Sequence, residues 1–251
     1  TCDKINELKP TLVQLSLMAY KPWVAKYSIK MVAEGPLPDF LERKELMAVI
    51  HRKLIEGGYV RVGWESYALP DDPMTKAFEE RSTWYAATGH QPGGRVNYIA
   101  VGSSSKMNLG DDYYAQNFYD IHTWKTCLQK GKFPVFRGMK LNKDDSIRQH
   151  ATQHIKSFLG FKFKYFKENF NIDAKEYFKK EIEGLREMIK DGIVEVTDTE
   201  IKLTEIGVDF SQNVANVFDK YDPPHKTDRE RLAHIEKAKL AQARVQAEAL
   251  K

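Results

Sequence analysis

The first 64 residues alternate between two kinds of apolar pattern, and this alternation limits the folds open to the chain. Leu12–Ala19 is a nearly continuous apolar run, which is typical of a strand buried on both faces of a parallel sheet. Residues 39–57 instead carry apolar side chains at helical spacing, and Gly57–Gly58 ends that pattern. Tyr59–Trp64 alternates like a second strand. Strand, helix, strand is the repeating unit of α/β proteins, so the sequence predicts an α/β fold.

Residues 94–117 contain the best candidate for a ligand contact. A β-prone run from Val96 to Val101 ends at Gly102, and three serines follow it. Small residues after a strand allow the backbone to approach a ligand closely, because no Cβ stands in the way. On these residues alone, a strand followed by a solvated loop is the simpler interpretation.

The pattern changes after residue 160. Helices are predicted over 144–158, 173–190 and 205–219, with a short hairpin formed by 193–197 and 201–204. This order of helices and hairpin is similar to that of a winged-helix domain. Pro223–Pro224 then separates it from a charged amphipathic helix, which begins with the capping box of Thr227 and Glu230.

Charge and composition narrow the classes of function. A net charge of +4, from 39 basic and 35 acidic residues, creates no overall field for nucleic acid. The predicted hairpin is acidic where a DNA-binding wing is basic, so we expect no nucleic-acid partner. No apolar run reaches the roughly 18 residues of a membrane span, and the N-terminus has no signal-peptide core. With two cysteines and no disulfide framework, we expect a cytoplasmic location.

Two histidines are weak candidates for metal or haem ligation. His150 and His154 lie four residues apart on a predicted helix, a spacing that can chelate a metal. No third ligand follows nearby, and His154 falls on the apolar face of that helix. A partly buried histidine is therefore the alternative interpretation. Cys127 on a helix is more often a small core residue than a nucleophile.

Six pieces of sequence, in order, resemble one enzyme family. They are INELKPTLVQLSLMAY near the start, GYVRVGWESYALPDDP at 58–73, VGSSSKMNLGDDYYAQN at 101–117, RGMKLNKDDSIRQH at 137–150, DGIVEVTDTEIKLTEIG at 191–207 and FDKYD at 218–222. From about Asp3 to Tyr221 the series resembles the C-terminal half of oxygen-independent coproporphyrinogen III oxidase, a radical S-adenosylmethionine (SAM) enzyme of haem biosynthesis.

The resemblance implies an α/β architecture in which the last part of a partial (β/α) barrel is followed by a mostly helical, winged-helix-like C-terminal domain. On this basis, residues 1–64 would end the barrel and residues 65–143 would form a barrel-to-lid α/β region. Residues 144–222 would form the winged-helix-like domain, acting as a lid. Residues 223–251 lie outside the resemblance as a charged helical extension.

The resemblance also implies cofactors that this chain does not hold alone. In the family, a Cys-x3-Cys-x2-Cys motif binds a 4Fe–4S cluster, which reductively cleaves SAM, and the resulting radical abstracts hydrogen from a porphyrinogen propionate. None of those three cysteines is present, because the sequence contains only Cys2 and Cys127. We therefore expect this polypeptide to be inactive alone and to need a polypeptide that carries the cluster-binding half.

Roles for individual residues follow from the resemblance. The contacts to SAM would come from Gly102, Ser103, Ser104 and Ser105. The contacts to a tetrapyrrole-like substrate, or to the domain junction, would come from Asp111, Asp112, Tyr113, Tyr114, Gln116 and Asn117. No catalytic residue is identified.

The leading hypothesis is a fragment or subunit of a radical SAM oxidoreductase that decarboxylates a porphyrinogen oxidatively. One alternative is a non-catalytic haem-binding or haem-transfer protein that uses His150 or His154. A second alternative is a module that has lost its catalytic half and binds partners through the charged helix at 227–251.

Overall fold

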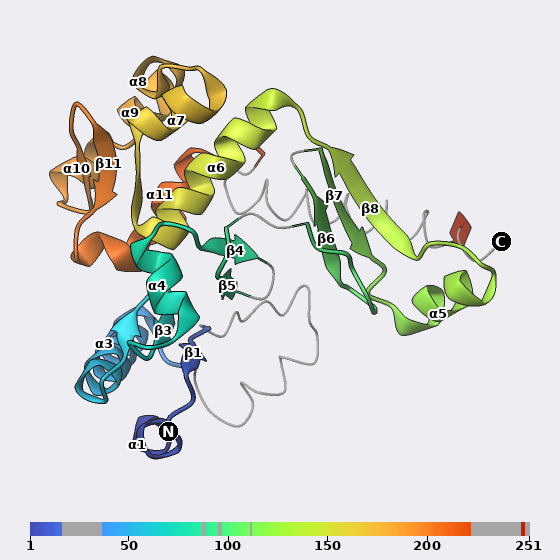
Figure 1. The fold of residues 1–251 in the computed structure, drawn as a ribbon, viewed down its shortest axis with the longest axis horizontal. Coiled ribbons are helices and arrows are strands. Elements are labelled where there is room, and N and C mark those ends of the chain that lie inside the picture. The colour runs from blue at the N-terminus through green and yellow to red at the C-terminus, as the bar shows by residue number, and fades with distance from the viewer. Residues whose placement is uncertain (17–36, 87–88, 95–96, 111, 222–246, 249–251) are drawn as a thin grey trace. The chain divides into compact units, whose positions relative to one another are not determined.

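The computed structural model describes residues 1–16, 37–86, 89–94, 97–110, 112–221 and 247–248. The chain forms two compact units, Thr1–Glu80 and Arg81–Lys251. Each unit combines helices with small antiparallel sheets, as Figure 1 shows, and this confirms the predicted α/β class. No helix in the described ranges is long and apolar enough to cross a membrane.

The first unit packs one long helix against a three-stranded sheet. Its elements are α1 (Cys2–Leu8), β1 (Leu12–Gln14), α3 (Phe40–Glu56), β2 (Val60–Arg61), β3 (Ser66–Ala68) and α4 (Pro73–Glu79). A capping box of Asp39 and Glu42 begins α3. Gly57 caps the other end, where the sequence pattern predicts that the helix ends. Leu54 of α3 is fully buried and forms the core of this unit together with Tyr59 and Tyr67.

The first strand is shorter than predicted and pairs in the other direction. The sequence predicts a strand over Leu12–Ala19 in a parallel sheet, but β1 covers Leu12–Gln14 and buries only Val13. It pairs antiparallel with β3, in the sheet order β1-β3-β2. Residues 17–19 lie outside the described part of the chain. The parallel pairing was wrong because an apolar run indicates burial without fixing the direction of the neighbouring strand.

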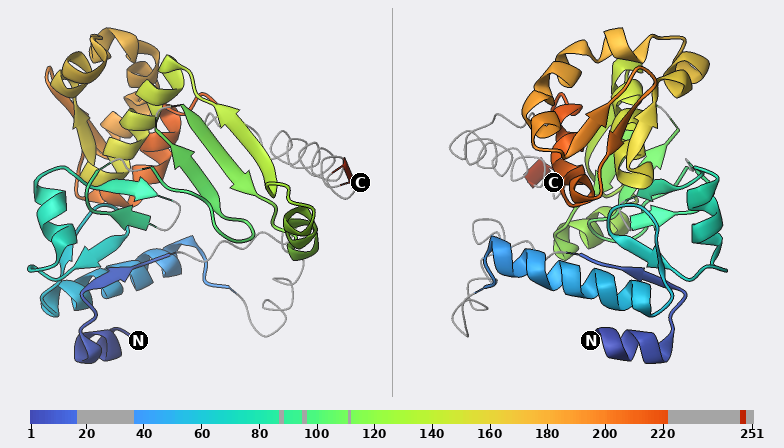
Figure 2. Two further views of the ribbon diagram at one scale, coloured as in Figure 1. Left: turned by 45° about the vertical axis from the view of Figure 1, so that its right-hand side comes forward. Right: turned by 90° about the vertical axis from the view of Figure 1, so that its left-hand side faces the viewer.

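The second unit begins with two antiparallel sheets. The hairpin of β4 (Trp84–Ala86) and β5 (Gly89–Gln91) is followed by the sheet of β6 (Lys106–Leu109), β7 (Tyr113–Asn117) and β8 (Val135–Lys140). Helix α5 (Ile121–Gln129) connects β7 to β8 and lies at one end of their sheet in both Figure 1 and Figure 2.

The strand predicted before Gly102 is wrong. Of the described residues 97–101, only Tyr98 makes a bridge, to Asn108. Ile99 and Val101 are 74% and 87% exposed, so their β-propensity does not reflect a buried strand here. The strands β6 and β7 follow the serine turn instead of preceding it.

The remaining elements surround the largest core of the protein. They are α6 (Lys143–Phe158), β9 (Gly160–Lys162), α7 (Phe163–Phe170), α8 (Ala174–Tyr177), α9 (Lys179–Gly184), α10 (Arg186–Lys190), β10 (Val194–Val196), β11 (Glu200–Leu203), η2 (Ile206–Phe210) and α11 (Ser211–Val217). The core is aromatic: Phe161, Phe166, Phe178 and Phe218 are all buried and contact one another through their ring edges.

The predicted hairpin is confirmed by β10 and β11, and β9 extends it to a sheet of order β10-β11-β9. The single helix predicted over 173–190 is divided into α8, α9 and α10. The description of this part as a winged helix stays a prediction. The helix predicted over 227–251 lies outside the described residues, apart from 247–248.

Candidate functional site

The predicted cofactor turn, Gly102–Ser105, is attached to the end of β7 by side chains. Gly102 has a φ of +98° and Ser104 a φ of +58°, so the backbone reverses within these residues. Asn117 Nδ2 donates to the carbonyl of Gly102 at 2.9 Å. Gln116 Nε2 donates to the carbonyl of Ser104 at 3.0 Å. The structure therefore brings together three groups of predicted site residues: the glycine, the serines and the two amides.

The two amide side chains have a role that the sequence did not reveal. Gln116 and Asn117 are 4% and 3% exposed, and both hold the turn rather than face solvent. Arg137 Nε and Nη2 donate to Gln116 Oε1 at 3.0 and 2.7 Å, which fixes the orientation of that amide. The buried Oδ1 atom of Asn117 has no hydrogen-bond partner within the described ranges, so it can still accept a hydrogen bond.

The other predicted substrate residues diverge along β7. Successive side chains of a strand point to opposite faces, so Tyr113 and Tyr114 separate. Tyr113 is 48% exposed, whereas Tyr114 lines a pocket. Asp112 is exposed, and Asp111 lies outside the described residues. Among the predicted residues, Tyr114 alone is placed in this pocket.

The pocket lies between the β7–β8 sheet, helix α6 and the segment that follows α11. Its volume is about 230 Å³, and it is lined by Tyr114, Met139, Leu141, Asp145, Arg148, Gln149, Thr152, Phe218, Asp219, Lys220 and Tyr221. Burial raises the pKa of Tyr114, while the guanidinium of Arg137 lowers it in part. Tyr114 is therefore a neutral phenol at neutral pH, able to donate a hydrogen bond or stack on a ring.

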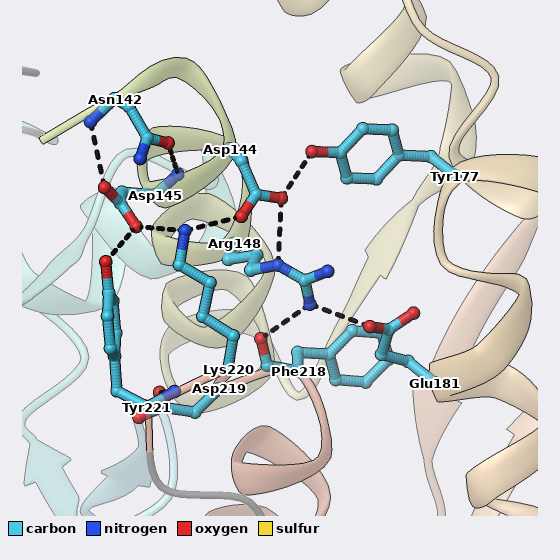
Figure 3. A network of polar contacts seen from close by, with 10 residues as sticks. All are labelled: Asn142, Asp144, Asp145, Arg148, Tyr177, Glu181, Phe218, Asp219, Lys220 and Tyr221. Carbon is cyan, nitrogen blue, oxygen red and sulfur yellow. Dashed lines mark hydrogen bonds and ion pairs between the residues drawn. The ribbon is translucent and has the colours of Figure 1, made fainter.

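Asp145, Arg148 and Lys220 form a charged wall of the pocket, and their ion pairs, which also include Asp144 and Glu181, are drawn in Figure 3. Lys220 Nζ lies 2.7 Å from Asp144 Oδ2 and 2.6 Å from Asp145 Oδ1. Arg148 contacts Asp144 Oδ1 through Nε at 2.9 Å and Glu181 Oε1 through Nη1 at 2.8 Å. Two cations thus meet three carboxylates. We call these five residues the ionic network.

Proton affinities in the ionic network follow from these contacts. Burial alone would raise the pKa of Asp144, but hydrogen bonds from Lys220, Tyr177 and Arg148 bring it down to about 2. The Tyr177 hydroxyl donates to Asp144 at 2.5 Å, and burial together with this bond raises the pKa of Tyr177 to about 12. Because the carboxylates outnumber the cations, the wall does not favour a further anion. Its apolar and aromatic surfaces suit a flat, largely apolar group.

The two candidate haem ligands are packed inside an aromatic cluster. The ring centroids of His150 and His154 are 6.3 Å apart, and Tyr165 stacks on His150. The Tyr165 hydroxyl lies 2.7 Å from His150 Nδ1. His154 is 8% exposed, and burial lowers its pKa to about 3. The Nδ1 atom of His154 has no hydrogen-bond partner among the residues described. This packing gives haem ligation no support.

An iron–sulfur cluster does not fit the cysteines of this chain. Such a cluster is held by cysteine thiolates, three in the family that the sequence resembles. Here Cys127 is buried on α5, and Cys2 lies on α1 in the other unit. Within the described ranges, no group of three or more His, Cys, Asp or Glu side chains is arranged to hold a metal ion.

Comparison with known proteins bears out the resemblance seen in the sequence. No protein-family model matches the chain. The oxygen-independent coproporphyrinogen III oxidase of Helicobacter pylori (strain 26695) is 27% identical over 221 residues, which are 88% of this chain and 48% of that protein. The Pseudomonas aeruginosa enzyme of the same name is 26% identical over 235 residues, 94% of this chain and 50% of the relative. The chain thus spans about half the length of the curated relatives it matches.

A solved structure extends this likeness to the fold. Coproporphyrinogen III oxidase from Escherichia coli, a radical SAM enzyme, matches with a TM-score of 0.80 and 22% identity. The match covers 87% of this chain and 50% of that one. Over most of its length, the chain is therefore similar to about half of an oxygen-independent coproporphyrinogen III oxidase, as fits the C-terminal half that the sequence predicts.

Proposed function

We propose that this chain is one half of a radical SAM enzyme resembling oxygen-independent coproporphyrinogen III oxidase, which acts on a porphyrinogen or a similar flat molecule. The observation that carries the proposal is the similarity of 88% of the chain to about half of relatives named for that reaction. Because this chain lacks the cysteines for the cluster, the cluster would be bound by the other half.

In this proposal, the present half contributes contacts to the substrate and to SAM. The turn Gly102–Ser105 would contact SAM, and its attachment to Gln116 and Asn117 would keep it in one conformation. Tyr114 would contact the ring of the substrate through the pocket. A pocket of about 230 Å³ is smaller than the roughly 300 Å³ at which sites for drug-sized ligands begin. It would hold one edge of a tetrapyrrole, and the other half would complete the site.

Binding of coproporphyrin III, the stable oxidised form of the substrate, tests the role of this pocket. We expect the chain to shift the Soret band of coproporphyrin III in a saturable titration. Tyr114→Ala should weaken the binding about fivefold, since an aromatic contact contributes on the order of 1 kcal/mol. Tyr113→Ala is the matched control, because it removes the exposed neighbouring ring, and it should stay within about twofold of the wild-type affinity. Equal affinities for the two variants would contradict the proposed pocket.

A further inference from the structure

Four apolar side chains of the second unit are exposed around one end of the β6–β7–β8 sheet. Their exposed fractions are 87% for Val101, 42% for Tyr119, 65% for Ile121 and 91% for Phe133. We call them the apolar end surface. Single exposed apolar residues are ordinary, but a group of them at one place marks an interaction site.

Backbone hydrogen bonds bring these residues together from three parts of the sequence. Ser104 N donates to the carbonyl of Phe118 at 2.7 Å, and Phe118 N donates to the carbonyl of Pro134 at 2.9 Å. Val101 lies three residues before Ser104, and its carbonyl accepts a bond of 2.6 Å from the Ser105 hydroxyl. Tyr119 directly follows Phe118, and Phe133 directly precedes Pro134.

The same bonds place the predicted cofactor turn beside the apolar end surface. Gly102 follows Val101 directly, and Asn117 holds the Gly102 carbonyl at the end of β7. Helix α5 begins at the same end of the sheet, with Ile121 as its first residue, and Figure 1 shows its position there. A partner that covers these side chains would therefore also lie next to the turn.

We infer that the apolar end surface is the docking surface for the cluster-binding half of a coproporphyrinogen oxidase-like polypeptide. This inference rests on the proposed function. The relatives are about twice as long as the part that this chain matches, and the solved Escherichia coli structure has another 50% of its chain beyond the match. A second half of that size needs an apolar contact surface on this one to remain associated with it. Docking here would cover the cofactor turn and exclude water from it.

The charges around the apolar end surface also indicate which chemistry the partner's surface should have. Lys125 and Lys132 are exposed beside Ile121 and Phe133. An apolar centre with lysines at its edge favours a partner surface that is apolar in the middle and acidic at the rim. The two halves could be joined in one polypeptide or associate as separate chains, and the contact would be the same.

A binding measurement between separate halves tests the inference. The probe is the half of the Helicobacter pylori oxidase that this chain does not match, titrated against the full chain by isothermal calorimetry. We expect the double variant Val101→Asp/Phe133→Asp to bind at least tenfold more weakly than the wild type, because both charges would be placed in the apolar centre of the contact. Since both side chains are exposed, the melting temperature of the variant should not change.

Ile206→Asp is the matched control. Ile206 is also an exposed apolar residue, at 66%, but it lies on η2, outside the apolar end surface, and its replacement should leave the affinity within twofold. Hydrogen exchange should slow at residues 99–101 and 131–133 when the probe binds. The inference is wrong if the wild-type chain does not bind the probe, or if the double variant binds it as tightly as the wild type. It is also wrong if the double variant loses only self-association of the chain or its binding to lipid vesicles. Coproporphyrin III binding uses no second half, so it tests the proposed function independently of the docking.

Discussion

Lys220 is the residue on which the contacts of the ionic network converge. Its ammonium group is shared by Asp144 and Asp145, and the Asp145 side chain is only 4% exposed. A buried carboxylate that loses its cation retains its desolvation penalty, whereas an exposed ion pair contributes little. The single lysine therefore ties the segment after α11 to the first turn of α6.

We expect Lys220→Met to lower the free energy of unfolding by about 2 kcal/mol, between the values for exposed and fully buried pairs. Lys190→Met is the control, because Lys190 pairs with Glu187 at 3.9 Å on the surface, with both side chains more than three-quarters exposed. It should change stability by less than about 0.5 kcal/mol. Urea unfolding of the two variants measures the difference, and equal losses would contradict the role assigned to Lys220.

At this scale the sequence did not indicate which groups two of the predicted site residues contact. Gln116 and Asn117 were expected to contact substrate or the domain junction, and in the structure their donor groups hold the Gly102–Ser105 turn. An amide side chain can bind either a ligand or a backbone carbonyl, and its position in the sequence does not distinguish the two. Helix α6 was predicted over 144–158, but its N-cap is Asn142, and Asp145 completes the capping box.

Among the elements, the first turn of α6 should make stability depend on pH. The pKa of Asp144 falls from 3.8 to about 2 in the folded protein. A carboxyl group with a lowered pKa stabilises the fold fully above pH 4, and this contribution is lost as the pH falls toward 2. We expect the difference in unfolding free energy between wild type and Asp144→Asn to be constant from pH 6 to 4 and to shrink below pH 4.

Urea midpoints at pH 6, 4, 3 and 2.5 measure this difference. The buried histidines, which also titrate as the pH falls, are common to both proteins and cancel in the comparison. A difference that stays constant down to pH 2.5 would show that Asp144 is not held by the network in solution.

Elements with a clear helical period were predicted well, and strands less so. The period and capping residues of α3 and α6 placed both helices within a few residues. The prediction of a strand before Gly102 is wrong because Ile99 and Val101, although apolar, are exposed in this chain. If the apolar end surface binds a second half, Val101 is buried only in the whole assembly. Strand direction also depends on distant partners, which a local pattern does not contain.

For the whole molecule, the ordered motifs predicted the relatives and a match to only about half of their length, and the comparisons agree with both. What the sequence could not give is the arrangement of the site, because the pocket joins β7, α6 and residues 218–221 from distant parts of the chain. Contacts over such separations follow from tertiary packing, not from any local motif. The ionic network was missed for the same reason, because its five residues come from α6, α9 and the segment after α11.

The most direct test of the proposed function is reconstitution of activity from two halves. The chain would be mixed under anaerobic conditions with the unmatched, cluster-loaded half of the Helicobacter pylori enzyme, a reductant, SAM and coproporphyrinogen III, and the release of CO₂ would be measured. We expect release from the mixture and none above background from either half alone. If calorimetry shows that the halves associate, yet the mixture releases no CO₂, this chain is not the catalytic complement that we propose.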